Sequence, residues 1–324
     1  MAVDVFVLGG YSRGIGARKV LREFERGGVG WGEAEAVIGL EEAMLVGVQA
    51  GAGLTYVSDP ALAWHDLLRP FVEAWRGVAV GGLARFFDNN FFYRVPVFTG
   101  KPDPKYYVLA KRAVFLSKIA PRGAGVKVFM PGPVTFAALS DTSVFGGMEE
   151  AAREIARILG EEARRALEAG ASVVEVAEPL LGDIDARPEH AGLLVDLLSK
   201  YFPDPSKLIV SIYYHPPSKE VAKELAVLKA QYLALDYADR PETFREAVKI
   251  ACPEGLAVGA VDARSIYLEP VERVEKALQT AKELCSPDRL ALTTTAPLDL
   301  IPQQHAIAKT RHLGHLARRL EEGA

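Results

Sequence analysis

Acidic, basic and imidazole side chains follow short apolar runs at several points along this chain. His215 and Asp236 each come directly after such a run, and Glu178 comes two residues after one. Asp262 follows a later run, two residues before Arg264. Carboxylate and imidazole groups can act as general acids and bases, and the arginine fork binds carboxylates or phosphates. These positions are therefore catalytic or binding candidates. Polar loops that serve only solubility are the simpler alternative, and the sequence leaves it open.

The apolar runs themselves indicate a parallel sheet. Eight runs rich in Val, Ile, Leu and Phe occur at residues 3–8, 54–57, 126–130, 172–176, 208–214, 232–235, 256–261 and 290–294. Continuous apolar character is typical of strands that are buried on both faces. Helical patterns separate most of them, as in residues 149–169, where alanine and isoleucine share one face. We therefore predict an α/β protein, a single (β/α)₈ TIM barrel over residues 1–324, whose site lies at the carboxyl ends of the strands.

One aromatic segment interrupts this alternation. Residues 86–97, FFDNNFFYRVPV, lie between the second and third predicted strands and are expected to form a hairpin-like excursion over the barrel mouth. Asn90 and Tyr93 in this segment, together with Tyr213, are candidates for binding a planar ligand. Ordinary aromatic packing in the rim is the alternative.

Composition excludes several classes of protein. Hydrophobic residues make up 49% and charged residues 25% of 324 residues, which excludes disordered, collagen-like and disulfide-scaffold proteins. The net charge of −4 and the absence of a basic block argue against nucleic-acid binding. No apolar run spans a bilayer, and no signal peptide is evident, so we expect a cytoplasmic protein without a membrane partner. Cys252 and Cys285 are expected to be separate, buried or half-buried thiols, in keeping with a reducing compartment.

The first loop, GGYSRGIG, has glycines spaced as in a dinucleotide-binding turn, at Gly10, Gly14 and Gly16. Such a unit needs a second strand that ends in an acidic residue about 20 positions later, and here a helix is predicted instead. A short-chain dehydrogenase is therefore disfavoured. Arg13 and Arg18 are better interpreted as anion binders, helped by the positive end of the helix that follows.

Six short motifs occur in order at the predicted strand ends. They are residues 10–13 (GYSR), 90–96 (NFFYRVP), 132–135 (GPVT), 177–181 (AEPLL), 261–265 (VDARS) and 298–302 (LDLIP). Together they resemble, nearly end to end, the N-terminal domain of the cobalamin-independent methionine synthase family.

The resemblance implies a role in methyl transfer to the homocysteine thiol. In that family two barrels face each other: the C-terminal barrel holds a zinc ion that activates the thiol, and the N-terminal barrel helps to bind the methyl donor. The zinc ligand positions fall on Tyr213, His215, Asp236 and Ala296, so both zinc cysteines are missing. We expect no metal or cofactor on this chain. His215 and Asp236, at adjacent strand ends, are weak metal candidates.

The resemblance thus implies a stand-alone subunit that works with a separate zinc-bearing barrel. The donor would be methyltetrahydropteroyl-glutamate or methylcobalamin. Glu178, Asp262 and His215 are the catalytic candidates. The candidates for binding substrate or donor are Arg13, Arg18, Asn90, Tyr93, Thr135, Tyr213, Arg264 and Ser265.

Two alternatives remain open. One is a corrinoid-linked methyltransferase or other enzyme on the same barrel, and the other is a non-catalytic scaffold or binding barrel. A closed polar pocket would favour an enzyme, whereas side chains that are splayed apart or covered by residues 86–97 would favour a scaffold. The side chains in question are Arg13, Asn90, Glu178, Tyr213, His215, Asp236, Asp262 and Arg264.

Overall fold

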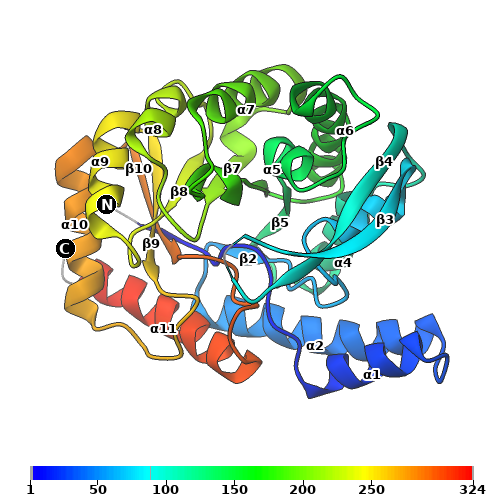
Figure 1. Cartoon of the computed structure of the whole chain (residues 1–324). Coiled ribbons are helices and arrows are strands. Elements are labelled where there is room, and N and C mark those ends of the chain that lie inside the picture. The colour runs from blue at the N-terminus through cyan, green and yellow to red at the C-terminus, as the bar shows by residue number, and fades with distance from the viewer. Residues whose placement is uncertain (1–2, 88, 323–324) are drawn as a thin grey trace.

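The computed structural model describes residues 3–87 and 89–322, and eight parallel strands form its centre (Figure 1). The strands are β1 (Asp4–Val5), β2 (Tyr56–Ser58), β5 (Gly125–Pro131), β6 (Val173–Ala177), β7 (Leu208–Ile212), β8 (Tyr232–Asp236), β9 (Gly255–Val261) and β10 (Arg289–Thr294). They lie in the order β1-β10-β9-β8-β7-β6-β5-β2. The backbone amide of Thr55 donates to the carbonyl oxygen of Val5 at 2.8 Å, which brings the two edges together. The predicted (β/α)₈ barrel is confirmed.

Helices surround this sheet, and the first of them packs against the second, to one side of the barrel (Figure 1). They are α1 (Ile15–Glu25), α2 (Trp31–Ala52), α3 (Arg69–Ala74), α4 (Val108–Ile119), α5 (Pro133–Ala138), α6 (Met148–Glu168), α7 (Pro188–Tyr201), α8 (Lys219–Leu225), α9 (Pro241–Ala251), α10 (Val271–Cys285) and α11 (Gln303–Glu322), with short 3₁₀ turns at Pro179–Gly182 and Pro205–Lys207. Among the described residues, no helix is long and apolar enough to cross a membrane.

The predicted excursion between the second and third barrel strands is a two-stranded antiparallel hairpin. Strands β3 (Trp75–Arg85) and β4 (Phe92–Pro104) form it and reach beyond residues 86–97 on both sides. The amide of Asp141 donates to the carbonyl oxygen of Pro96 at 2.8 Å, and the Tyr93 hydroxyl donates to that of Leu139 at 2.9 Å. These bonds fix the hairpin against the loop that follows α5, at the carboxyl end of the barrel.

The barrel interior combines an apolar layer with a buried ion pair. Phe6, Leu8, Val173, Ile209 and Tyr232 fill one layer, in keeping with strands that are buried on both faces. Beside this layer, fully buried Lys127 on β5 pairs with fully buried Glu175 on β6. Inside a protein such a pair needs further hydrogen bonds, and Glu175 also accepts from the Ser211 hydroxyl at 2.8 Å and from the Gly9 amide at 3.0 Å.

The two cysteines form a disulfide, so the expectation of separate thiols is wrong. Cys252 follows α9 and Cys285 ends α10, and these helices return to the amino end of the neighbouring strands β9 and β10. The return of both helices to one place sets the two Cα atoms 5.2 Å apart, within the range that a disulfide spans. The cysteines therefore no longer support the prediction of a reducing compartment.

Candidate functional site

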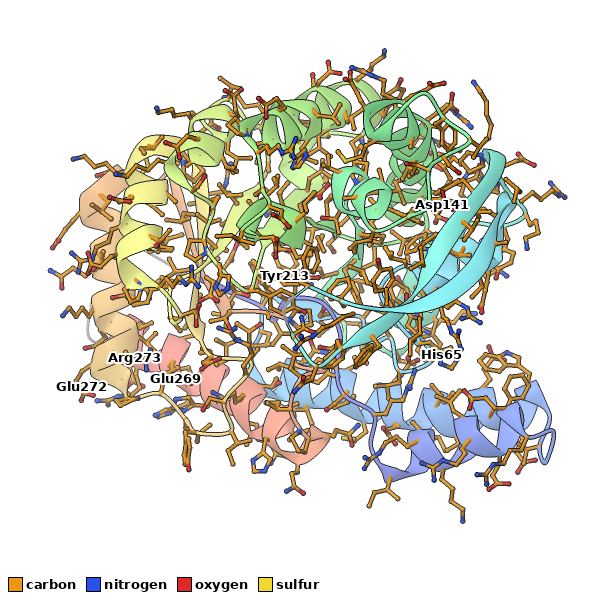
Figure 2. The ribbon with its side chains drawn as sticks, viewed as in Figure 1. His65, Asp141, Tyr213, Glu269, Glu272 and Arg273 are labelled. Atoms are coloured by element: carbon orange, nitrogen blue, oxygen red, sulfur yellow. A yellow bond between two sulfur atoms is a disulfide. The ribbon has the colours of Figure 1, made fainter. Side chains whose placement is uncertain are left out.

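A cavity of about 780 Å³ opens at the carboxyl end of the barrel, within the usual size range of ligand pockets. Its walls come from the loops after β1, β2, β7 and β10 and from the hairpin. Much of the lining is aromatic, and the Phe, Tyr and Trp residues are Tyr11, Trp64, Phe86, Phe91, Phe92, Tyr93, Phe129, Tyr213 and Tyr214. Figure 2 shows Tyr213 near the middle of the barrel mouth and His65 on the side of α1 and α2. Flat apolar walls of this kind suit a planar ligand.

Arg13 lines the cavity, but its guanidinium also holds a neighbouring loop. Its Nε donates to the carbonyl oxygen of Leu62 at 2.6 Å, and its Nη2 donates to that of Trp64. Burial lowers the pKa of Arg13, although Glu25 and Asp299 oppose that shift. The sequence predicted an anion-binding fork here. The structure shows that part of the fork already binds backbone oxygens of the loop after β2.

The amino end of α1 is also occupied. The carboxylate of Glu41 on α2 accepts from the Gly14 amide at 2.5 Å and from the Ala17 amide at 3.1 Å. The expectation that this helix end would help to bind an external anion is therefore wrong, because Glu41 supplies the negative charge. Arg18 lines the cavity with an exposed side chain whose Nε donates to the Gly14 carbonyl oxygen at 3.3 Å.

Replacing Arg13 by alanine is expected to lower the free energy of unfolding by about 1–3 kcal/mol, because two loop carbonyls lose their donors. This differs from the effect expected of a pure ligand-binding arginine, whose loss would leave stability unchanged. Arg18→Ala is the matched control, since Arg18 also lines the cavity but bonds only within its own turn. Urea denaturation of both variants gives the answer. Equal stability of the two would contradict a loop-holding role for Arg13.

Asp299 lines the cavity but is not among the site residues predicted from the sequence. It lies in the LDLIP motif after β10, and its side chain is open to the cavity while protein surrounds it on the other sides. This environment raises the pKa of Asp299 to about 6, against the influence of Arg13. A lone acid in an otherwise apolar motif behind the last strand is the signal that could have found it.

Glu178 and Thr135 lie together, away from the cavity lining. The fully buried carboxylate of Glu178 accepts from the amides of Val134 and Thr135 at 3.0 and 2.8 Å and from the Thr135 hydroxyl at 2.5 Å. It thereby satisfies the free amides at the start of α5. Burial raises the pKa of Glu178 to about 7, and these hydrogen bonds oppose that shift. The observed contacts of Glu178 are those of a helix cap.

A second polar cluster lies after β7, β8 and β9. Asp239 joins it: one carboxylate oxygen lies 2.7 Å from Nδ1 of His215, and the other lies 2.7 Å from Nη2 of Arg264. His215 thus pairs with Asp239, three residues beyond Asp236, the other weak metal candidate. Oδ1 of Asp236 accepts from the Asp239 amide at 3.1 Å, and burial raises the pKa of Asp236 to about 8.

Asp262 and Ser265 make local bonds in the same region. Oδ1 of Asp262 accepts from the Arg264 amide at 2.9 Å, and the Ser265 hydroxyl accepts from the Tyr267 amide at 3.3 Å. Within residues 3–87 and 89–322, no group of three or more His, Cys, Asp or Glu side chains is placed to hold a metal ion.

The predicted site residues are therefore divided. Arg13, Arg18, Tyr93 and Tyr213 line the cavity, whereas the other candidates belong to the Glu178 cap, to the His215–Asp239–Arg264 cluster or to the hairpin tip, where Asn90 is exposed. The rings of Phe86 and Phe87 lie against Tyr214, each with ring centroids 6.3 Å apart, so the hairpin covers part of the mouth. The structure therefore shows neither a closed polar pocket that contains all the candidate side chains nor a set of candidates that is wholly splayed apart or covered by residues 86–97.

Comparison with known families decides the relationship. Residues 76–286 match the family described as the cobalamin-independent synthase, N-terminal domain. The chain belongs to this family. It therefore falls among the methyltransferases of the methionine synthase class, as the order of its six motifs had indicated.

Curated relatives and solved structures agree with this assignment. A methionine synthase of Sulfolobus acidocaldarius is 22% identical over 94% of this chain and 88% of its own length. One from Sulfurisphaera tokodaii is 22% identical over 80% of this chain and 75% of its own. A B12-independent methionine synthase structure from Shewanella sp. W3-18-1, in complex with selenomethionine, has a TM-score of 0.79 at 20% identity, covering 91% of each chain. At that identity the structural likeness shows the shared fold.

Proposed function

We propose that this chain is the donor-binding barrel of a two-part methionine synthase, and that a separate zinc-bearing barrel completes the enzyme. The observation that carries the proposal is the family match to the N-terminal domain of the cobalamin-independent synthase. The residues at the zinc ligand positions of the catalytic barrel support it, since His215 and Ala296 stand where the resemblance requires cysteines.

The proposed division of labour follows from the chemistry of the thiol. A thiolate attacks a methyl group far better than a thiol does, and zinc lowers the pKa of a coordinated thiol. In the proposed enzyme the partner supplies this activated nucleophile. The present chain supplies the aromatic cavity, which would hold the flat part of a methyltetrahydropteroyl-glutamate donor and exclude water around it.

Exposed apolar side chains at the carboxyl end support a partner barrel on this face. Ile184 in the loop after β6 is 93% exposed, and Tyr267 in the loop after β9 is 79% exposed, with Ile266 and Leu268 beside it. Ile266, Tyr267 and Leu268 are consecutive in the chain, and exposed apolar side chains that are grouped in this way are typical of a protein interface. The zinc-bearing barrel is the occupant that this proposal assigns to that surface.

The test mixes this chain with a separately purified zinc-bearing methionine synthase barrel and measures methyl transfer to homocysteine. We expect no turnover and no stoichiometric zinc in the isolated chain, and turnover when the two barrels are combined. Tyr267→Asp is expected to abolish the gain from mixing without loss of stability, because Tyr267 is exposed. Lys207→Asp, in the turn that precedes β7 at the opposite end of the barrel, is the control. Stoichiometric zinc with turnover in the chain alone would refute the two-part proposal.

A non-catalytic binding barrel is the second candidate. The observation that favours it is the position of the predicted catalytic residues Glu178, Asp262 and His215 outside the cavity lining. Calorimetric titration of the isolated chain with the methyl donor distinguishes the donor-binding enzyme subunit from a non-catalytic scaffold. Donor binding favours the enzyme subunit, and absence of donor binding favours the scaffold.

A further inference from the structure

Backbone contacts with the loop after β1 hold the segment that carries Asp299. The Leu298 amide donates to the Gly10 carbonyl oxygen at 3.0 Å, and Leu298 forms an isolated parallel bridge with Tyr11. Pro297 packs against Gly9, which has a positive φ of 50°. The lack of a side chain at Gly9 allows this close approach, since a Cβ there would lie 2.5 Å from Cγ of Pro297. The segment that carries Asp299 is therefore fixed to the loop after β1, and the carboxylate has a defined position at the cavity wall.

The Asp299 carboxylate is available for a ligand. The backbone amide of Asp299 itself donates a hydrogen bond to this carboxylate. Within the described residues no other side chain forms an ion pair or hydrogen bond with it, even though Arg13 is close enough to lower its pKa. Arg13 is turned toward the carbonyl oxygens of Leu62 and Trp64, which hold its Nε and Nη2. The raised pKa of about 6 leaves Asp299 mainly ionised at neutral pH.

The surroundings of Asp299 restrict what this ligand can be. Tyr213 and Tyr214, from the loop after β7, line the same cavity as Asp299. Burial raises the pKa of both phenols, and the charge of Asp299 adds to the shift. Their rings lie nearly perpendicular, at 89°, with centroids 4.9 Å apart. A negative carboxylate with two acceptor oxygens beside flat aromatic walls fits a planar ring that carries two neighbouring N–H donors on one edge.

We propose that Asp299 binds the edge of a reduced pterin ring formed by its exocyclic 2-amino group and the adjacent ring N–H. This inference rests on the proposed function and makes it more specific, because it selects the pterin over the corrinoid as the donor. A corrinoid carries amide side chains at its periphery and offers no such pair of N–H donors within the plane of its ring. Asp299 is a binding residue in this arrangement and takes no part in the transfer itself.

Calorimetric titration of the isolated chain tests the assignment with two probes. The first is methyltetrahydropteroyl-triglutamate, and the second is p-aminobenzoyl-triglutamate, which lacks the pterin. Asp299→Asn is expected to weaken binding of the first probe about tenfold or more, since an amide cannot accept both hydrogen bonds. Its affinity for the second probe is expected to stay unchanged. Asp185→Asn, an exposed carboxylate in the loop after β6 and outside the cavity lining, is the charge-matched control.

A chemical variant of the ligand gives the same answer without any substitution in the protein. A 2-desamino-2-methyl analogue of the methylated pterin donor is expected to bind the unaltered chain about tenfold or more weakly than the donor itself. Equal affinity for the two ligands, or equal affinity of the Asp299→Asn and unaltered chains for the donor, would overturn the role of Asp299 while leaving the proposed function intact. If the unaltered chain binds neither triglutamate probe, the donor-binding function itself fails, and this inference fails with it.

Discussion

Replacing Glu175 by leucine is expected to lower the free energy of unfolding by about 3–5 kcal/mol, because it leaves an uncompensated charge in the barrel interior. Lys127 and Glu175 are both fully buried, and their side chains are paired. The substitution also removes the acceptor for the Ser211 hydroxyl and for the Gly9 amide. The measurement is urea denaturation followed by circular dichroism, with the midpoint and the slope analysed together.

A double variant separates the charge from the packing. Lys127→Met combined with Glu175→Leu removes both charges, so we expect it to recover most of the loss, since buried pairs are often replaceable by apolar residues of similar size. Glu175→Gln is the isosteric control, which keeps an acceptor oxygen near the Gly9 amide. A loss of less than about 1 kcal/mol in the free energy of unfolding for Glu175→Leu alone would be no more than one ordinary hydrogen bond contributes. Such a result would contradict the charge penalty expected for unpaired Lys127.

The barrel could be predicted because its signal is local. The strands from β5 to β10 consist mostly of apolar residues buried on both faces, and this gives a nearly continuous apolar pattern that is visible in short windows of the sequence. Helix α6 likewise shows its buried face through Ala152, Ile155 and Leu159. The disulfide could not be predicted in this way. Its two cysteines are 33 residues apart, and only the return of α9 and α10 to one end of the sheet brings them together.

The candidate site could be predicted only in part, because strand ends determine which face of the barrel a residue occupies but not what its side chain contacts. Glu178 lies at the predicted end of its strand, yet the start of α5 uses its carboxylate. His215 pairs with Asp239, a loop residue whose position depends on the turn after β8. Arg13 and Asp299 both reach the cavity, but whether they meet depends on loop carbonyl oxygens that leave no pattern in the sequence.

Loss of the Cys252–Cys285 disulfide is expected to lower the free energy of unfolding by about 3–4 kcal/mol, the loop-entropy value for a closed loop of this length. The reason lies in the unfolded chain, where the bond restricts the segment that includes β9 and α10. The bond lies at the amino end of the barrel, so ligand binding at the carboxyl end is expected to stay unchanged. The comparison is urea denaturation of the unaltered chain and of Cys252→Ser/Cys285→Ser, each with and without dithiothreitol. Reductant should shift only the unaltered chain, bringing it close to the double variant. If reductant leaves the stability of the unaltered chain unchanged and the double variant is equally stable, the bond contributes nothing to stability.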